Sequence, residues 1–201
     1  LNILPENTVV IFTSDNGGTR RYVEPLRGGK GTLYEGGLRV PMIIHGPGIA
    51  KGSTDEPVST IDIFPTLCDL ANLPMSGKTI DGESLGPLWN GGSLERDMLF
   101  WHFPCYIGQG GPSSAMRKGD FKLIEFFESG TIELYNLKTD PEEKNDLSGK
   151  ESQRAKTLHD ELKQIQAQFD APRPTAPNPD YDPSTVRKKG RDQRGKGKKK
   201  K

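Results

Sequence analysis

The stretch TVVIFTSDNGG, residues 8–18, sets the framework of the fold. Its first seven residues, Thr8–Ser14, are rich in β-branched and aromatic side chains and are apolar at consecutive positions. This pattern predicts a strand buried on both faces, as in a parallel sheet. A second apolar run at Arg39–His45 predicts another such strand after a long glycine-rich loop. Two such strands need partner strands that these residues do not supply, so we expect residues 1–95 to be an incomplete α/β domain.

The second half of the chain predicts a small α+β unit over residues 96–170. Apolar residues at spacings of four, three and four predict an amphipathic helix over Glu151–Phe169. Four strands are expected, the last three as a meander with glycine-containing turns: Met98–Phe103, Ser114–Lys118, Phe121–Phe127 and Thr131–Leu137. An antiparallel sheet covered by one helix can form a core of its own.

A shorter helix is predicted over Asp62–Asn72, with Ile61, Phe64 and Cys68 on the face that packs against the core. Cys68 and Cys105 are the only cysteines, too few for a disulfide scaffold or a zinc site. They form either one bridge or two free thiols.

The charge is unevenly distributed, although the net charge is only +1. Residues 187–201 hold 10 basic side chains and one acidic one, leaving 18 bases against 26 acids, a net charge of −8, in residues 1–186. Proline recurs from Ala171 onward, so residues 171–201 are expected to be disordered. The run Arg187–Lys201 either contacts a polyanion or is a solvated end. No aromatic residue follows Tyr181, so we expect no sequence-specific binding of nucleic acid.

Two short segments carry candidate chemistry. Asp15 and Asn16 follow a predicted buried strand, and their oxygens suit a hard cation such as Ca²⁺ or Mg²⁺, although D-N-G-G is also ideal turn chemistry. In the loop Leu26–Pro41, glycines would let the backbone approach a bound group, and Lys30 would place a positive charge beside an oxyanion. The alternative is a flexible loop with solvated Arg and Lys side chains. The spacing does not match a phosphate-binding Walker loop.

Several motifs occur in an order that resembles the C-terminal part of a type I sulfatase of the alkaline phosphatase-like superfamily. They are T-S-D-N-G-G, L-R-G-G-K-G-T-x-Y-E-G-G-x-R-V-P, H-G-P-G and T-x-D-I-F-P-T-L, followed by R-K-G-D-F-K-L-I and E-L-Y-N-L-K-T-D-P-E-E-K-N-D-L. The resemblance covers roughly residues 1–168. It implies an α/β fold contributing the last strands of a mostly parallel sheet, followed by a small α+β subdomain with an antiparallel sheet and one helix.

The resemblance also implies roles for individual residues. Asp15 and Asn16 match a late pair of metal ligands, normally to Ca²⁺, with Mg²⁺ as an alternative. Lys30 matches the catalytic lysine that contacts the sulfate group, and His102 lies where some members line the substrate pocket. The implied activity is metal-assisted hydrolysis of a sulfate ester carried by a small molecule or a polysaccharide.

The chain departs from the family pattern at the nucleophile. Sulfatases use a formylglycine made from Cys or Ser in a C-x-P-S-R-type motif, and neither Cys68 nor Cys105 lies in one. The formylglycine is therefore expected in a missing N-terminal part, and the isolated chain is expected to be inactive. Glu35 and Arg39 match positions that organise the loop, as an ion pair.

Parts of the sequence are compatible with two other functions. A phosphodiesterase or phosphonate hydrolase of the same superfamily would place His where Asn16 and Lys30 stand. A non-catalytic polyanion-binding protein would use the basic tail, but the two buried strands would then expose apolar edges. No run approaches the roughly 20 apolar residues that cross a bilayer. A periplasmic or extracellular location is implied by the resemblance alone.

Overall fold

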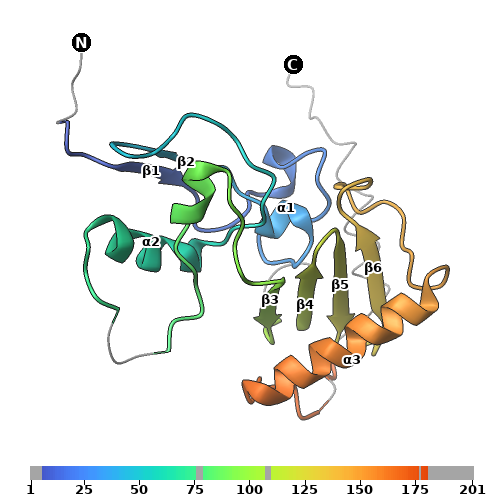
Figure 1. Ribbon diagram of the computed structural model, residues 1–201. Helices are drawn as coiled ribbons and strands as arrows, with labels where there is room; N and C mark the ends of the chain where they lie inside the picture. Colours follow the sequence, from blue (N-terminus) through green and yellow to red (C-terminus); the bar gives the residue numbers. More distant parts are fainter. Residues whose placement is uncertain (1–5, 76–78, 107–109, 177, 181–201) are drawn as a thin grey trace, which may run out of the picture. The chain divides into compact units, whose positions relative to one another are not determined.

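The computed structural model describes residues 6–75, 79–106, 110–176 and 178–180 (Figure 1). The chain divides into two compact units. The first comprises Leu1–Asn16 with Arg39–Leu99, and the second comprises Gly17–Leu38 with Phe100–Lys201. The glycine-rich loop thus belongs to the C-terminal unit, although the sequence placed it with the strands on either side of it.

A two-stranded ribbon opens the first unit. Strands β1 (Val10–Thr13) and β2 (Met42–His45) pair antiparallel, with Phe12 opposite Ile43. Within the described residues they pair only with each other, and the partner strands that the sequence predicts lie outside these residues. Strands β1 and β2 are also not buried on both faces, since Phe12 is 59% and Ile43 61% exposed. Consecutive apolar residues indicate which side chains must be covered, but they do not say which part of a protein covers them.

Helix α2 (Ile63–Leu70) follows the 3-10 turn η2 (Thr60–Asp62), and a further 3-10 turn, η3, spans Gly86–Asn90. The buried Asp62 carboxylate accepts hydrogen bonds from the backbone N–H groups of Ser59 and Glu83 and pairs with Arg96. The predicted inner face of the helix is correct only at Cys68, because Ile61 and Phe64 are exposed. Both cysteines are free thiols.

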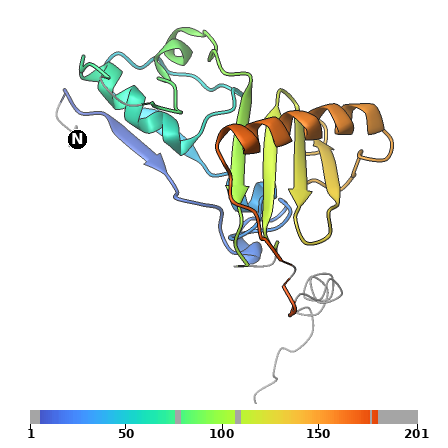
Figure 2. The ribbon, with the colours of Figure 1, turned by 90° about the horizontal axis from the view of Figure 1, so that it is seen from below.

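The second unit is built on a four-stranded sheet in the order β3-β4-β5-β6. Its strands are β3 (Met98–Phe103), β4 (Ser113–Lys118), β5 (Phe121–Phe126) and β6 (Ile132–Asn136). Pairs β4–β5 and β5–β6 are antiparallel, and helix α3 (Ser152–Gln168) lies across the strands (Figure 2). The predicted meander and helix are confirmed to within one residue. Apolar side chains of α3 complete the core, namely Ala155, Leu158 and Leu162.

The segment after α3 is ordered further than the sequence suggested. The carbonyl of Pro172 lies 2.7 Å from Nε2 of His102, and Arg173 pairs with the buried Glu125 at 2.6 Å. The prediction of disorder from residue 171 is therefore wrong for this short stretch, which polar contacts fix to the sheet. The basic run Arg187–Lys201 lies outside the described residues. None of the described helices is both long enough and apolar enough to cross a membrane.

Candidate functional site

The loop that carries Lys30 is closed by its own backbone. The N–H of Gly36 donates to the carbonyl of Arg27 at 2.8 Å, and the N–H of Lys30 donates to the carbonyl of Gly18 at 2.8 Å. The Thr32 hydroxyl donates to the carbonyl of Gly29 at 2.8 Å. The side chain of Lys30 remains exposed. The alternative of a flexible loop is therefore not what the structure shows: the backbone is fixed while the ammonium group is available to a ligand.

Two glycines make this closure possible. A Cβ atom on Gly36 would lie 2.5 Å from the carbonyl oxygen of Arg27, and one on Gly37 would lie 2.1 Å from that of Thr32. Both residues belong to the short helix α1 (Glu35–Leu38) at the end of the loop. The sequence predicts that glycines here let the backbone approach a bound group. At these two positions they instead let the loop pack against itself.

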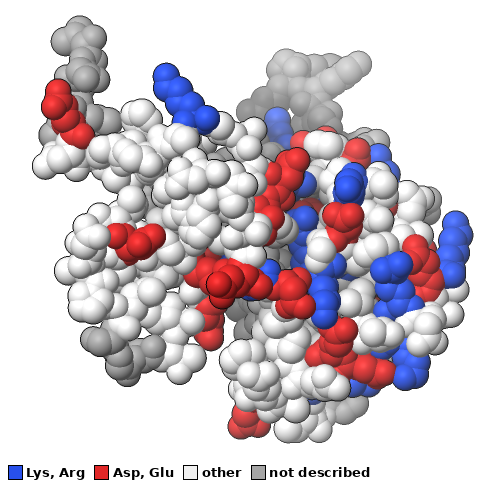
Figure 3. All heavy atoms as spheres, viewed as in Figure 1, with Lys and Arg blue, Asp and Glu red and all other residues white. Residues whose placement is uncertain are grey.

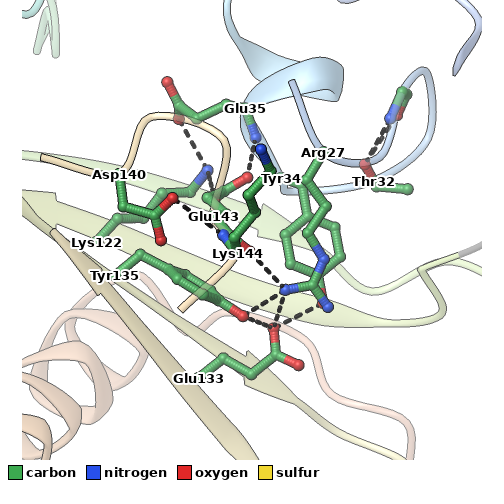
Figure 4. Close-up of polar contacts among 11 residues, drawn as sticks. Arg27, Thr32, Tyr34, Glu35, Lys122, Glu133, Tyr135, Asp140, Glu143 and Lys144 are labelled. Carbon is green, nitrogen blue, oxygen red and sulfur yellow. Dashed lines mark hydrogen bonds and ion pairs between the residues drawn. The ribbon is translucent and has the colours of Figure 1, made fainter. Parts of the chain in front are cut away.

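Arg27 fixes the start of the loop to strand β6 (Figure 4). Its guanidinium donates to the Tyr135 hydroxyl and, at 3.0 Å, to the carbonyl of Glu143, and it stacks on the ring of Tyr34 at 4.1 Å. Burial, together with the Glu133 carboxylate, raises the pKa of both tyrosines far above that of a free phenol. Both hydroxyls therefore stay protonated and donate to Glu133, at 2.7 and 2.6 Å.

Glu35 fixes the end of the loop through a buried lysine (Figure 4). Nζ of Lys122, on β5, lies 2.9 Å from a carboxylate oxygen of Glu35 and 2.9 Å from one of Glu143. The N–H of Glu35 donates to the second oxygen of Glu143 at 2.7 Å. Burial raises the pKa of Glu143, while Lys122 favours its ionised form. The expected pairing of Glu35 with Arg39 is wrong, because Lys122 occupies the Glu35 carboxylate.

The proposed metal ligands lie in the first unit, directly after β1. The Asp15 side chain is exposed, and the Ser14 hydroxyl donates to the carbonyl of Asn16 at 3.0 Å. Their donor set consists of a carboxylate and an amide oxygen, which fits a hard cation as part of a larger set. Within the described ranges no cluster of three or more His, Cys, Asp or Glu residues could hold a metal ion. The remaining ligands would have to come from elsewhere.

His102 is held within the second unit by protein partners. Its Nδ1 lies 2.6 Å from the Ser114 hydroxyl, and its Nε2 lies 2.7 Å from the carbonyl of Pro172. Its ring stacks on Phe100 with centroids 6.2 Å apart. These contacts tie β3 to β4 and to the segment after α3. A role for His102 in substrate binding stays a prediction.

Sequence reasoning missed the anchors of the loop: Arg27, Lys122 and Glu143. A lysine inside the apolar strand FKLIEF was a possible signal, because a buried ammonium group requires carboxylate partners. The sequence does not say which carboxylates these are. Glu35 and Glu143 are 87 and 21 residues away from Lys122.

A family model for the C-terminal part of N-sulphoglucosamine sulphohydrolase matches residues 29–168. The match begins in the Lys30 loop and ends with the last residue of α3, so it takes in the sheet and helix of the second unit. The chain belongs to this family of sulfatase C-terminal regions. This confirms the family predicted from the ordered motifs.

Individual sulfatases agree with this membership. A sulfatase of Formosa agariphila is 40% identical over 161 residues, which cover 72% of this chain and 29% of that protein. Human arylsulfatase A is 36% identical over 201 residues, which cover 84% of this chain and 39% of that protein. The solved structure of BT4656 with its substrate D-glucosamine-2-N,6-O-disulfate has a TM-score of 0.61 at 27% identity, covering 82% of this chain and 35% of that one. The chain thus spans well under half of each relative.

Proposed function

We propose that the chain is the C-terminal part of a sulfuric ester hydrolase, in which Lys30 binds the sulfate group of the substrate. The observation that carries this proposal is the exposed Lys30 on a loop with a fixed backbone, inside the region that the sulfatase family matches. A rigid loop holds a positive charge where negative charge develops during the reaction, and no reorganisation is then needed. The formylglycine nucleophile would be supplied by a part of the protein outside these residues.

Asp15 and Asn16 are the proposed ligands of a divalent cation, Ca²⁺ or Mg²⁺. When bound, such a cation supplies Lewis-acid stabilisation of a sulfate oxygen. The carboxylate of Asp15 would supply charge, and the amide oxygen of Asn16 would add a neutral ligand. Lys30 would bind a further sulfate oxygen through its ammonium group. Asn16 and Lys30 also favour sulfate over phosphodiester or phosphonate hydrolysis, because enzymes of that kind usually carry His at these positions.

The proposed substrates are sulfate esters of small molecules or polysaccharides, and sulfated sugars are the first to test. The support is that BT4656 is solved with a sulfated glucosamine as its substrate. A periplasmic or extracellular location, and contact of Arg187–Lys201 with a polyanion, are further proposals that follow from such substrates.

The test is turnover by the full-length protein carrying this chain, matured so that its formylglycine forms. We expect release of sulfate from a fluorogenic aryl sulfate and from glucosamine sulfates, and much slower cleavage of the matching phosphonate ester. Dialysis against a chelator should remove the activity, and Ca²⁺ or Mg²⁺ should restore it. Faster cleavage of the phosphonate would assign the protein to the alternative function, and activity that survives chelation would remove the metal proposal.

The exposed apolar face of the first unit supports the proposal that more protein covers it. Figure 3 shows few charged side chains over β1, β2 and α2, where large apolar residues are exposed. In the full-length protein, Phe12→Asp should lower the free energy of unfolding by about 3 kcal/mol, because a buried charge replaces a packed ring. If residue 12 instead stays in water in the full-length protein, Phe12→Asp should change the free energy of unfolding by no more than about 0.5 kcal/mol. Phe12→Leu is the control, and equal melting temperatures for both variants would show that the face is uncovered.

A further inference from the structure

Lys122 is a fully buried charge beside the proposed active-site loop. It lies on β5 and is 0% exposed, whereas a lysine in a sheet normally extends to solvent. One ammonium group faces two carboxylates, Glu35 at 2.9 Å and Glu143 at 2.9 Å. Burying these charges is favourable only while all three stay together. Separating the three groups would leave a buried charge without its partner, so the cluster resists rearrangement.

The parts that it joins are the sheet and the Lys30 loop. Lys122 belongs to the sheet, and Glu35 is the first residue of α1 at the end of the loop. Glu143 accepts a hydrogen bond from the Glu35 N–H at 2.7 Å, so it holds both the backbone and, through Lys122, the side chain of Glu35. Its φ of 54° is unusual for a residue other than glycine. The loop around Glu143 thus adopts a costly conformation in order to make these contacts.

A shift of Glu35 would reach Lys30 through the backbone. The N–H of the next residue, Gly36, donates to the carbonyl of Arg27 at 2.8 Å. This hydrogen bond closes the loop around Lys30. The carbonyl of Glu143 accepts a hydrogen bond from Arg27 at 3.0 Å. Both ends of the loop therefore depend on the residues that Lys122 holds in place.

We propose that Lys122 is a positioning residue for the sulfatase reaction: through Glu35 and Glu143 it fixes the loop that presents Lys30 to the sulfate group. The inference rests on the proposed function. It means that the C-terminal sheet determines where the sulfate-binding ammonium group stands. A displacement of about 1 Å in a positioned group can cost about 100-fold in rate.

A double-mutant cycle in the full-length, formylglycine-bearing enzyme tests this role, with a fluorogenic aryl sulfate as the substrate. Lys122→Met should lower kcat/KM about 10- to 100-fold. In a Lys30→Ala background the same substitution should change kcat/KM by less than about threefold, because the group that it positions is already gone. Lys122→Arg should recover part of the loss. A purely structural role would lower activity by the same factor in both backgrounds, and that result would overturn the proposal.

Glu125→Gln is the matched control. Glu125 lies on the same strand and is buried, but its partners are Gln166, His159 and Arg173 rather than the loop. The Glu125→Gln substitution should leave kcat/KM within about twofold of wild type at a temperature where the variant and the wild type are both folded. If Lys122→Met does not fold, Glu35→Gln takes its place in the same cycle, and an equal loss with and without Lys30 again overturns the proposal. An inactive wild type would instead refute the proposed function.

Discussion

Replacing Lys30 with alanine is expected to lower kcat of the full-length enzyme on an aryl sulfate by about 10²- to 10³-fold. The loop backbone on both sides of Lys30 is held by its own hydrogen bonds, so removal of the side chain should leave the site intact. On the proposed function, the substitution removes a fixed positive charge beside a sulfate oxygen. The measurement is steady-state kinetics, with circular dichroism to show that the fold persists.

Lys30→Arg and Lys51→Ala complete this test. Arginine keeps the charge but spreads it over a longer planar group, so Lys30→Arg should retain part of kcat. Lys51 is an exposed lysine in the first unit, and its removal should leave kcat unchanged. If Lys30→Ala stays within about twofold of wild type, the sulfate-binding role of this residue is wrong.

Replacing Gly37 with alanine is expected to destabilise the second unit by about 3 kcal/mol. The added methyl group would lie 2.1 Å from the carbonyl oxygen of Thr32 and 2.6 Å from that of Gly29. Neither atom belongs to a side chain that can turn away, so the loop itself must open. The N–H of Gly17 would also lose its bond to the carbonyl of Gly37, now 2.9 Å long. Native-state hydrogen exchange over residues 27–38 should show faster exchange of the loop amides.

Gly149→Ala separates this steric effect from the general cost of changing a glycine. Gly149 lies in the same unit, and a Cβ atom there would have no heavy atom within 4 Å. We expect a change below about 0.5 kcal/mol. Similar exchange rates in the two variants would mean that the loop relaxes around the methyl group, and the tight closure described for Gly36 and Gly37 would then not be needed.

Local patterns predicted the second unit well. The meander and α3 follow from alternation, turns and helical spacing within short segments, and each of these signals lies inside the element that it predicts. The order of the motifs around Asp15, Lys30 and Glu133 also sufficed to identify the family. The same patterns gave the wrong inner face for α2, where Ile61 and Phe64 are exposed, because they do not specify the partner of an apolar surface.

The sequence by itself determined the family, the small α+β unit and the residues that carry the proposed chemistry. Only the tertiary structure decided which unit holds the Lys30 loop and how it is fixed there. The loop packs with the C-terminal sheet because Leu33 enters a core cluster with Ile124 and Tyr135. It is fixed there because Lys122 meets carboxylates from two distant parts of the chain. Such a meeting depends on how the whole unit closes, and no local periodicity encodes it.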